Sequence, residues 1–186
     1  MNVLIEAARE VSAFMAEHQW GHCIIGGLAL QTWGRPRTTL DVDMTLLTGW
    51  GNEASYVDAM LERFPSRLSD ARDFALERRI LLLRAGNGKD VDVALGALPF
   101  EEDMVGRAVL RVFGEGIMLP CCTAEDLFVM KVFAGRPRDW EDAESIVMRQ
   151  TDLDRGYILS HLEELCALKE TPDSLARGRR LLGEKP

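Results

Sequence analysis

The chain has 186 residues, enough for one full domain or for a catalytic domain with a helical appendage. Hydrophobic residues make up 47% and charged residues 28%, which excludes a disordered or fibrous protein. The net charge of −8 disfavours partners such as duplex DNA or an anionic membrane, because the field of the whole molecule repels polyanions. No apolar run reaches the roughly 20 residues of a membrane helix and no signal peptide is apparent, so we expect a cytoplasmic protein.

Apolar periodicity and turn residues mark a series of elements in the first 120 residues. A glycine pair separates the first strand from the second helix, and Gly86-Asn87-Gly88 predicts a hairpin. In chain order we expect a helix over 2–18, a strand over 22–25, a helix over 28–33, a strand over 40–47, a helix over 55–64, hairpin arms over 74–84 and 89–95, a short helix over 99–109, and one or two strands within 110–119.

Only helices are expected after this point. Thr123 and Asp126 match an N-cap with an acidic third helical residue. The expected helices cover 124–134, 140–150, 155–169 and 174–182. We therefore predict an α/β (α+β) fold with a mixed sheet flanked by helices, divided into a catalytic core over 1–120 and a helical C-terminal region over 121–186 packed on that core. The four cysteines lack paired spacing, which predicts buried thiols rather than a zinc site or disulfides.

Two aspartates in the strand over 40–47 are the first candidates for chemistry. Side chains i and i+2 of a strand point to the same face, so Asp41 and Asp43 project together. Like charges held so close repel unless a cation neutralises them. Mg²⁺ is the expected cation, because it takes one or two carboxylates and completes its shell with water and phosphate oxygens.

A third carboxylate comes from the second hairpin arm. Asp92 is flanked by Val91 and Val93 and is committed to the sheet, whereas Asp90 lies beside the turn. Three carboxylates on adjacent strands can hold two Mg²⁺ ions roughly 3.5 to 4 Å apart. Gly26 and Gly27 stand at a strand-to-helix junction, where absent side chains either let backbone N–H groups approach a triphosphate or simply permit a tight turn.

These segments resemble the GG…R-x-T-x-DxD signature of minimal nucleotidyltransferases of the polymerase-beta-like superfamily, in particular the AbiEii type of abortive-infection and toxin–antitoxin systems. The residues around Asp92 are similar to that family's third catalytic Asp. Arg138 stands where the family usually has Lys. The similar segments run from about residue 24 to residue 142 and comprise 25–30, 34–39, 41–43, 91–93, 123–131 and 134–142.

The resemblance implies a role for each matching residue. Asp41, Asp43 and Asp92 would bind metal, and Asp92 would also help activate the acceptor hydroxyl. The residues assigned to nucleotide binding are Gly26, Gly27, Arg37, Thr39 and Lys131.

Some of these residues have alternative interpretations. Arg35 and Arg37 either bind phosphate or cover the sheet edge, and Thr38 or Thr39 orients their loop. Lys131 is the one polar residue of an apolar run, which favours phosphate binding over a solvated position. Asp139 and Asp142, further along the chain, are interpreted as structural partners of Arg136 or Arg138. 

The sequence therefore predicts an EC 2.7.7 type nucleotidyltransferase that moves NMP from an NTP to a hydroxyl of a tRNA, a protein or a small molecule. The resemblance adds a role in phage defence or as a toxin with a cognate antitoxin. The alternative is a catalytically silent nucleotide- or partner-binding module of the same fold.

Overall fold

The computed structural model describes residues 2–184, which form nine helices and one six-stranded sheet. They divide into two compact units. Unit 1 comprises Met1–Leu28 and Thr38–Cys122, and unit 2 comprises Ala29–Arg37 and Thr123–Pro186. The short segment that joins unit 2 from the N-terminal side includes most of helix α2 (Gly26–Trp33).

Unit 1 contains the sheet, which has the strand order β3-β4-β2-β1-β6-β5. The pairs β2–β4 and β1–β6 are parallel and the other neighbours are antiparallel, so the predicted mixed sheet is confirmed. The strands are β1 (His22–Ile24), β2 (Val42–Leu47), β3 (Ile80–Arg84), β4 (Asp90–Gly96), β5 (Val109–Phe113) and β6 (Ile117–Cys121).

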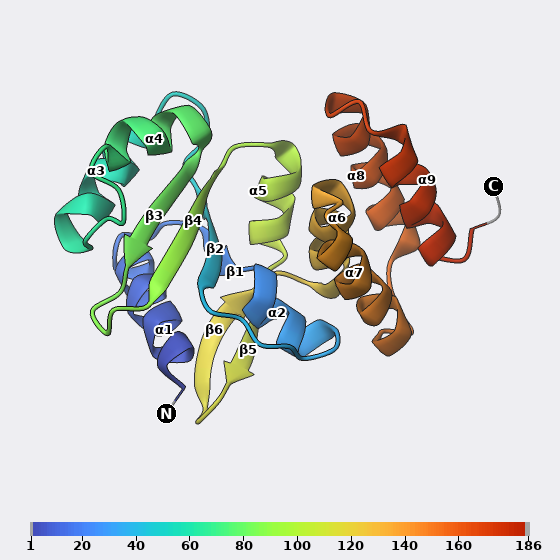
Figure 1. Ribbon diagram of the computed structural model, residues 1–186, viewed down its shortest axis with the longest axis horizontal. Helices are drawn as coiled ribbons and strands as arrows, with labels where there is room; N and C mark the ends of the chain where they lie inside the picture. The colour runs from blue at the N-terminus through green and yellow to red at the C-terminus, as the bar shows by residue number, and fades with distance from the viewer. Residues whose placement is uncertain (1, 185–186) are drawn as a thin grey trace. The chain divides into compact units, whose positions relative to one another are not determined.

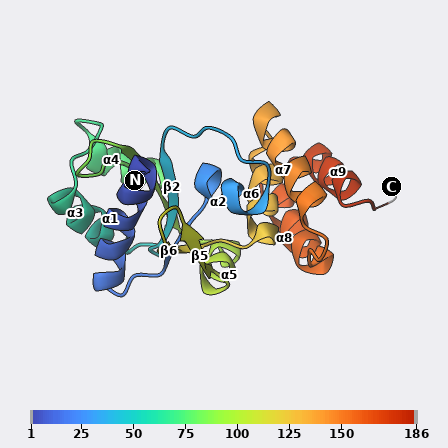
Figure 2. The same cartoon turned by 90° about the horizontal axis from the view of Figure 1, so that it is seen from below.

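Helices cover both faces of this sheet. Helix α1 (Val3–Glu17) packs on β1, β2 and β6 through Ala7, Ala8, Val11 and Met15, none of which is exposed. Helix α5 (Pro99–Gly106) contacts β2, and Figure 2 shows α1 and α5 on opposite sides of the strands. Helices α3 (Glu53–Arg63) and α4 (Ala71–Arg78) pack together beside β3 (Figure 1).

Unit 2 contains four helices after residue 122, as predicted: α6 (Ala124–Ala134), α7 (Pro137–Arg149), α8 (Arg155–Leu168) and α9 (Pro172–Leu181). Helix α6 contacts the other three, and its Leu127, Phe128 and Val129 are fully buried. The predicted cap is present, because Thr123 and Asp126 form a capping box. An all-round buried helix of this kind forms the core of the bundle.

Two predictions about local structure were wrong. The hairpin arm predicted over 74–84 is a strand only from Ile80, because α4 covers Ala71–Arg78. Ala71 and Ala75, one helical turn apart, are both buried, and Arg79 ends the helix in the left-handed conformation with φ 54°. Asp41 does not lie on β2, because the strand begins at Val42 and Asp41 occupies the bend before it.

The cysteines are buried thiols, as expected. All four are free in the structure. Among the described residues, no helix combines the length and the apolar character that a membrane crossing needs.

Candidate functional site

Three carboxylates of unit 1 form a cluster, which we call the carboxylate cluster: Asp41, Asp43 and Asp92. One oxygen from each lies within 4.8 Å of the other two. The parallel register of β2 and β4 places Asp43 directly opposite Asp92, and Asp41 precedes Asp43 by two positions. The neighbours Val42 and Met44 are fully buried on the other face, which fixes the aspartates on this one. The predicted juxtaposition of these carboxylates is therefore present.

The electrostatics of the carboxylate cluster suit a cation. Burial raises the pKa of Asp92 above its ordinary value, and the charges of Asp43 and Asp41 raise it further, while the Arg67 guanidinium opposes them. An oxygen-only donor set of three convergent carboxylates matches the ligand preference of Mg²⁺. The residues present thus fit a hard divalent ion, which would relieve the repulsion.

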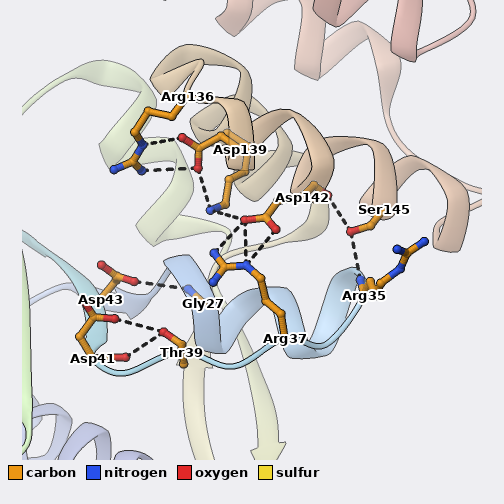
Figure 3. Close-up of polar contacts among 11 residues, drawn as sticks. Gly27, Arg35, Arg37, Thr39, Asp41, Asp43, Arg136, Asp139, Asp142 and Ser145 are labelled. Atoms are coloured by element: carbon orange, nitrogen blue, oxygen red, sulfur yellow. Dashed lines mark hydrogen bonds and ion pairs between the residues drawn. The ribbon is translucent and has the colours of Figure 1, made fainter.

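The glycine pair lies against this cluster. Gly26 has φ +59°, and a Cβ there would collide with the Asp43 carboxylate. A Cβ on Gly27 would lie 2.5 Å from Thr39 Oγ1. The Gly27 N–H donates to Asp43 Oδ2 at 3.3 Å (Figure 3). The two glycines therefore allow the start of α2 to approach the carboxylate closely, and phosphate binding by their backbone stays a prediction.

Thr39 holds the first aspartate of the cluster. Its hydroxyl lies 3.1 Å from Asp41 Oδ1 and 3.3 Å from the Asp41 carbonyl oxygen, and it donates to these acceptors (Figure 3). Asp41 lies outside the strand and so lacks the restraint of the β-ladder. Thr39 supplies that restraint, in keeping with the predicted role of this threonine in orienting the loop.

One residue of this site was missed by the sequence analysis. Arg67 donates through Nη2 to Asp92 and through Nη1 to Asp90, the second contact at 3.1 Å. Asp90 also accepts from Arg84 at 3.3 Å, so this carboxylate beside the turn has two ion-pair partners. Arg67 lies in the loop between α3 and α4, where no motif or periodicity marks it.

Unit 2 contains a different charged group, which we call the ion-pair chain: Arg136, Asp139, Lys131, Asp142 and Arg37. Buried Lys131 contacts Asp139 at 3.0 Å and Asp142 at 2.8 Å. Arg37 donates to both oxygens of Asp142, with Nε–Oδ1 at 3.0 Å and Nη2–Oδ2 at 2.9 Å, and Arg136 pairs with Asp139 at 2.6 Å (Figure 3). The predicted pairing of Asp139 with Arg136 is confirmed, whereas the described ion pairs of Asp142 are with Arg37 and Lys131 in place of the predicted Arg136 or Arg138.

The two carboxylates of the ion-pair chain are held ionised. Burial alone would raise the pKa of Asp142, but hydrogen bonds from Arg37 and Lys131 lower it below its ordinary value. Arg136 and Lys131 likewise lower the pKa of Asp139 against the effect of burial. The charges of Lys131 and Arg37 thus already have anionic partners inside unit 2, and their predicted binding of phosphate stays a prediction.

Arg35 and Arg37 also border a cavity of unit 2. Its volume is about 520 Å³, and its lining combines both arginines and Arg138 with Glu141 and Glu144. The Arg35 N–H donates to Ser145 Oγ at 3.0 Å, which fixes the loop to α7. The cavity wall carries both signs of charge, so it does not by itself select an anion.

Comparison with solved structures identifies this fold. The chain is similar to an antigenic nucleotidyltransferase-like protein from Paracoccidioides brasiliensis, with 14% identity, a TM-score of 0.54, and coverage of 94% of this chain and 92% of that one. It is also similar to the antibiotic-resistance factor ANT(2'')-Ia, with 16% identity, a TM-score of 0.50, and coverage of 91% and 94%. No protein-family model matches the sequence, and no curated protein matches it. The likenesses establish a nucleotidyltransferase fold.

Proposed function

We propose that the protein is a metal-dependent nucleotidyltransferase that moves a nucleoside monophosphate from an NTP to a hydroxyl acceptor. The observation that carries the proposal is the carboxylate cluster, whose three oxygens converge within 4.8 Å on a nucleotidyltransferase fold. Likeness of fold alone does not give activity, since one fold can carry many functions. The convergence of three carboxylates is a feature of the site itself, and it costs repulsion that a structural role does not require.

Asp41, Asp43 and Asp92 would hold Mg²⁺, with two ions the expected number. Bound Mg²⁺ would supply positive charge to the triphosphate and to the departing pyrophosphate. In the proposed reaction the acceptor oxygen forms a bond to the α-phosphorus, and the bond from that phosphorus to the pyrophosphate oxygen breaks. The hydroxyl proton would pass to a carboxylate oxygen of Asp92, the member of the carboxylate cluster to which the sequence resemblance assigns activation of the acceptor.

The remaining residues of the site would position these groups. Thr39 orients Asp41, and the Gly26–Gly27 turn keeps Asp43 in place while bringing the start of α2 close to it. Backbone N–H groups at a helix start suit phosphate, which supports a role for this turn in binding the triphosphate. Direct nucleotide contacts by Arg37 and Lys131 are a further proposal that rests on the sequence resemblance.

The class of acceptor is proposed from the charge of the chain and from its similarities to other proteins. The net charge of −8 favours a small molecule, a protein or a structured RNA such as tRNA over duplex DNA. ANT(2'')-Ia is described as an antibiotic-resistance factor, which supports screening drug-like hydroxyl compounds first. An AbiEii-type toxin with a cognate antitoxin rests on the resemblance of sequence, and growth arrest on expression would support it.

Calorimetry with each of the four NTPs, with and without Mg²⁺, tests the proposal. We expect Mg²⁺-dependent binding of at least one NTP by the wild type and its loss in the Asp41→Ala, Asp43→Ala double variant. Asp58→Asn is the matched control, because Asp58 is half exposed and pairs only with Arg72 among the described residues. Pyrophosphate release is then followed across a panel of acceptors.

The outcomes separate the candidate functions. Metal-dependent binding followed by pyrophosphate release supports the enzyme. Metal-dependent binding without release from any acceptor favours the silent nucleotide-binding module. Equal NTP binding by the wild type and the double variant would show that the carboxylate cluster is not the site.

A further inference from the structure

Arg67 is the one basic residue that contacts the carboxylate cluster among the described ion pairs. Its guanidinium bridges Asp92, a member of the cluster, and Asp90, two positions earlier on the same face of β4. Its partners in the described part of the chain are these two carboxylates, and its buried Nε donates to neither of them nor to any other described residue. The described hydrogen bonds of this side chain are therefore all to the two acids.

Backbone pairing with β3 sets the position of the Arg67 side chain. The Arg67 N–H donates to the Leu82 carbonyl at 3.0 Å, and Ser66 forms an isolated antiparallel bridge with Leu83. Leu82 in turn lies opposite Asp92 in the register of β3 and β4. Arg67 thus aligns with Asp92 at a distance of two strand spacings, roughly 10 Å between backbones. Only a long side chain that passes over Leu82 spans that distance.

The charges beside Asp92 include one fixed cation. Among the described ion pairs, Arg67 is shared by Asp92 and Asp90, and Arg84 pairs with Asp90 as well. A guanidinium cannot lose its proton, so Arg67 is a permanent positive charge beside a metal ligand. A metal ion that uses Asp92 meets a cation already bound to it, while Asp90 offers that cation a second partner.

We propose that Arg67 is the counter-ion of Asp92 in the metal-free protein. Arg67 competes with the metal ion for the Asp92 carboxylate, and it pairs with Asp90 alone once the metal binds. This inference rests on the proposed metal-dependent function. In the absence of metal, Arg67 limits the repulsion that three convergent carboxylates would otherwise suffer. The same contact weakens the affinity of the free protein for metal, since each bound ion must overcome a positive charge.

Binding of Mn²⁺ to the nucleotide-free full chain, measured by calorimetry, tests the inference without using activity. We expect Arg67→Gln to bind Mn²⁺ about tenfold more tightly than the wild type, because the competing charge is gone. Arg84→Gln is the matched control. It removes a charge from the same Asp90, but its side chain is 56% exposed and does not reach Asp92, so its affinity stays within about twofold of the wild type.

A second variant and a second measurement guard against a folding defect. Arg67→Lys keeps the charge but cannot hold both carboxylates with one planar fork, so we expect a gain in affinity of about two- to threefold. In thermal unfolding, Arg67→Gln should melt below the wild type without metal and show the larger rise in Tm with Mn²⁺.

The outcomes are distinct. Tighter Mn²⁺ binding by Arg67→Gln with Arg84→Gln unchanged supports competition. If the wild type binds Mn²⁺ and Arg67→Gln binds it equally well, the competition is overturned and the metal site stands. If both Arg67 variants bind Mn²⁺ more weakly than the wild type, the competition is also overturned, and Arg67 only positions Asp92. Absence of Mn²⁺ binding in every variant, with and without ATP, overturns the proposed function and this inference together.

Discussion

Unit 1 and unit 2 each gather aspartates at one place, but they arrange the charges in opposite ways. In the carboxylate cluster three acids converge, and Arg67 pairs with one of them, Asp92. In the ion-pair chain two acids are shared among three cations, so anions are outnumbered. Removing an acid from the first group relieves repulsion, whereas removing an acid from the second takes one of two carboxylates from buried Lys131.

The difference matches the roles proposed for the two groups, metal binding for the carboxylate cluster and stabilisation of unit 2 for the ion-pair chain. Lys131, Asp139 and Asp142 are all under 10% exposed, and their charges are satisfied by one another. The carboxylates of the cluster are only partly buried, which leaves them accessible to an ion from solvent. A high local density of charge is thus no sign of function until its sign and its pairing are known.

The largest expected effect comes from breaking the ion-pair chain. Asp142→Ala leaves Lys131 with one carboxylate and removes the anchor of Arg37, so the free energy of unfolding should fall by about 3 kcal/mol or more. Asp43→Asn in metal-free buffer should leave it unchanged or raise it, because that change reduces repulsion. Urea denaturation monitored by circular dichroism measures both.

Arg136→Ala is the control for the ion-pair chain. Its side chain is 75% exposed, and exposed pairs contribute little, so the loss should stay below about 1 kcal/mol. Equal destabilisation by Asp142→Ala and Asp43→Asn would show that the two units do not differ in the way their charges are paired.

A smaller effect on stability, with a sharper effect on the site, is expected from Gly26→Ala. The left-handed backbone alone costs an alanine about 1 to 2 kcal/mol, and the new Cβ collides with the Asp43 carboxylate. We therefore expect a loss of roughly 2 kcal/mol or more together with loss of Mn²⁺ binding. Calorimetric titration of Mn²⁺ and urea denaturation test the two parts separately.

Gly135 provides the comparison in unit 2. It has φ +68° at the end of α6, but the nearest atom to an added Cβ is 3.4 Å away. Gly135→Ala should cost about 1 kcal/mol and leave Mn²⁺ binding unchanged. Retention of normal Mn²⁺ affinity by Gly26→Ala would mean that the glycine is needed for its backbone conformation alone.

The direction of the clustered carboxylates could be predicted from local rules, whereas the parallel pairing of β2 with β4 that brings Asp43 beside Asp92 is long-range. The i, i+2 spacing of Asp41 and Asp43 and the hairpin that carries Asp92 specify which face each side chain takes. The cap of α6 was equally local, since Thr123 and Asp126 are three positions apart. Such signals do not depend on how the rest of the chain packs.

The partners of the charged residues could not be predicted in the same way. Arg37 and Asp142 are 105 positions apart, so their pairing depends on the packing of unit 2. Arg67 pairs with Asp92 because a single β-bridge between Ser66 and Leu83 positions its loop beside β3. A single bridge leaves no periodic pattern in the sequence. Helix α4 was mistaken for part of a strand because the turn at Gly86-Asn87-Gly88 predicts a hairpin but does not fix where its first arm begins, whereas tertiary burial of Ala71 and Ala75 decides the outcome.

The smallest effect concerns a buried polar group of unit 1 that needs no cation. His22 Nδ1 donates to the Trp20 carbonyl at 2.8 Å, so the neutral ring can accept the Ser12 hydroxyl at Nε2 over 2.7 Å. Burial lowers the pKa of His22 below the ordinary 6.5, although the Trp20 contact opposes this. The unfolded chain then takes up a proton at higher pH than the folded one. The contribution of neutral His22 to the free energy of unfolding is fully present above about pH 6.5, and it declines as the pH falls toward the lower folded-state pKa.

His22→Gln removes the titration while keeping an amide that can donate and accept. We expect the wild type to lose up to about 1 kcal/mol more than this variant between about pH 7.5 and about pH 5.5, as measured by urea denaturation without metal. Repeating the pair with Mn²⁺ sharpens the contrast within unit 1. Mn²⁺ should stabilise both proteins equally, because its proposed ligands are the carboxylate cluster and His22 contacts Ser12 and Trp20 instead. A pH dependence that is identical in the two proteins would show that His22 keeps its ordinary pKa in the folded state.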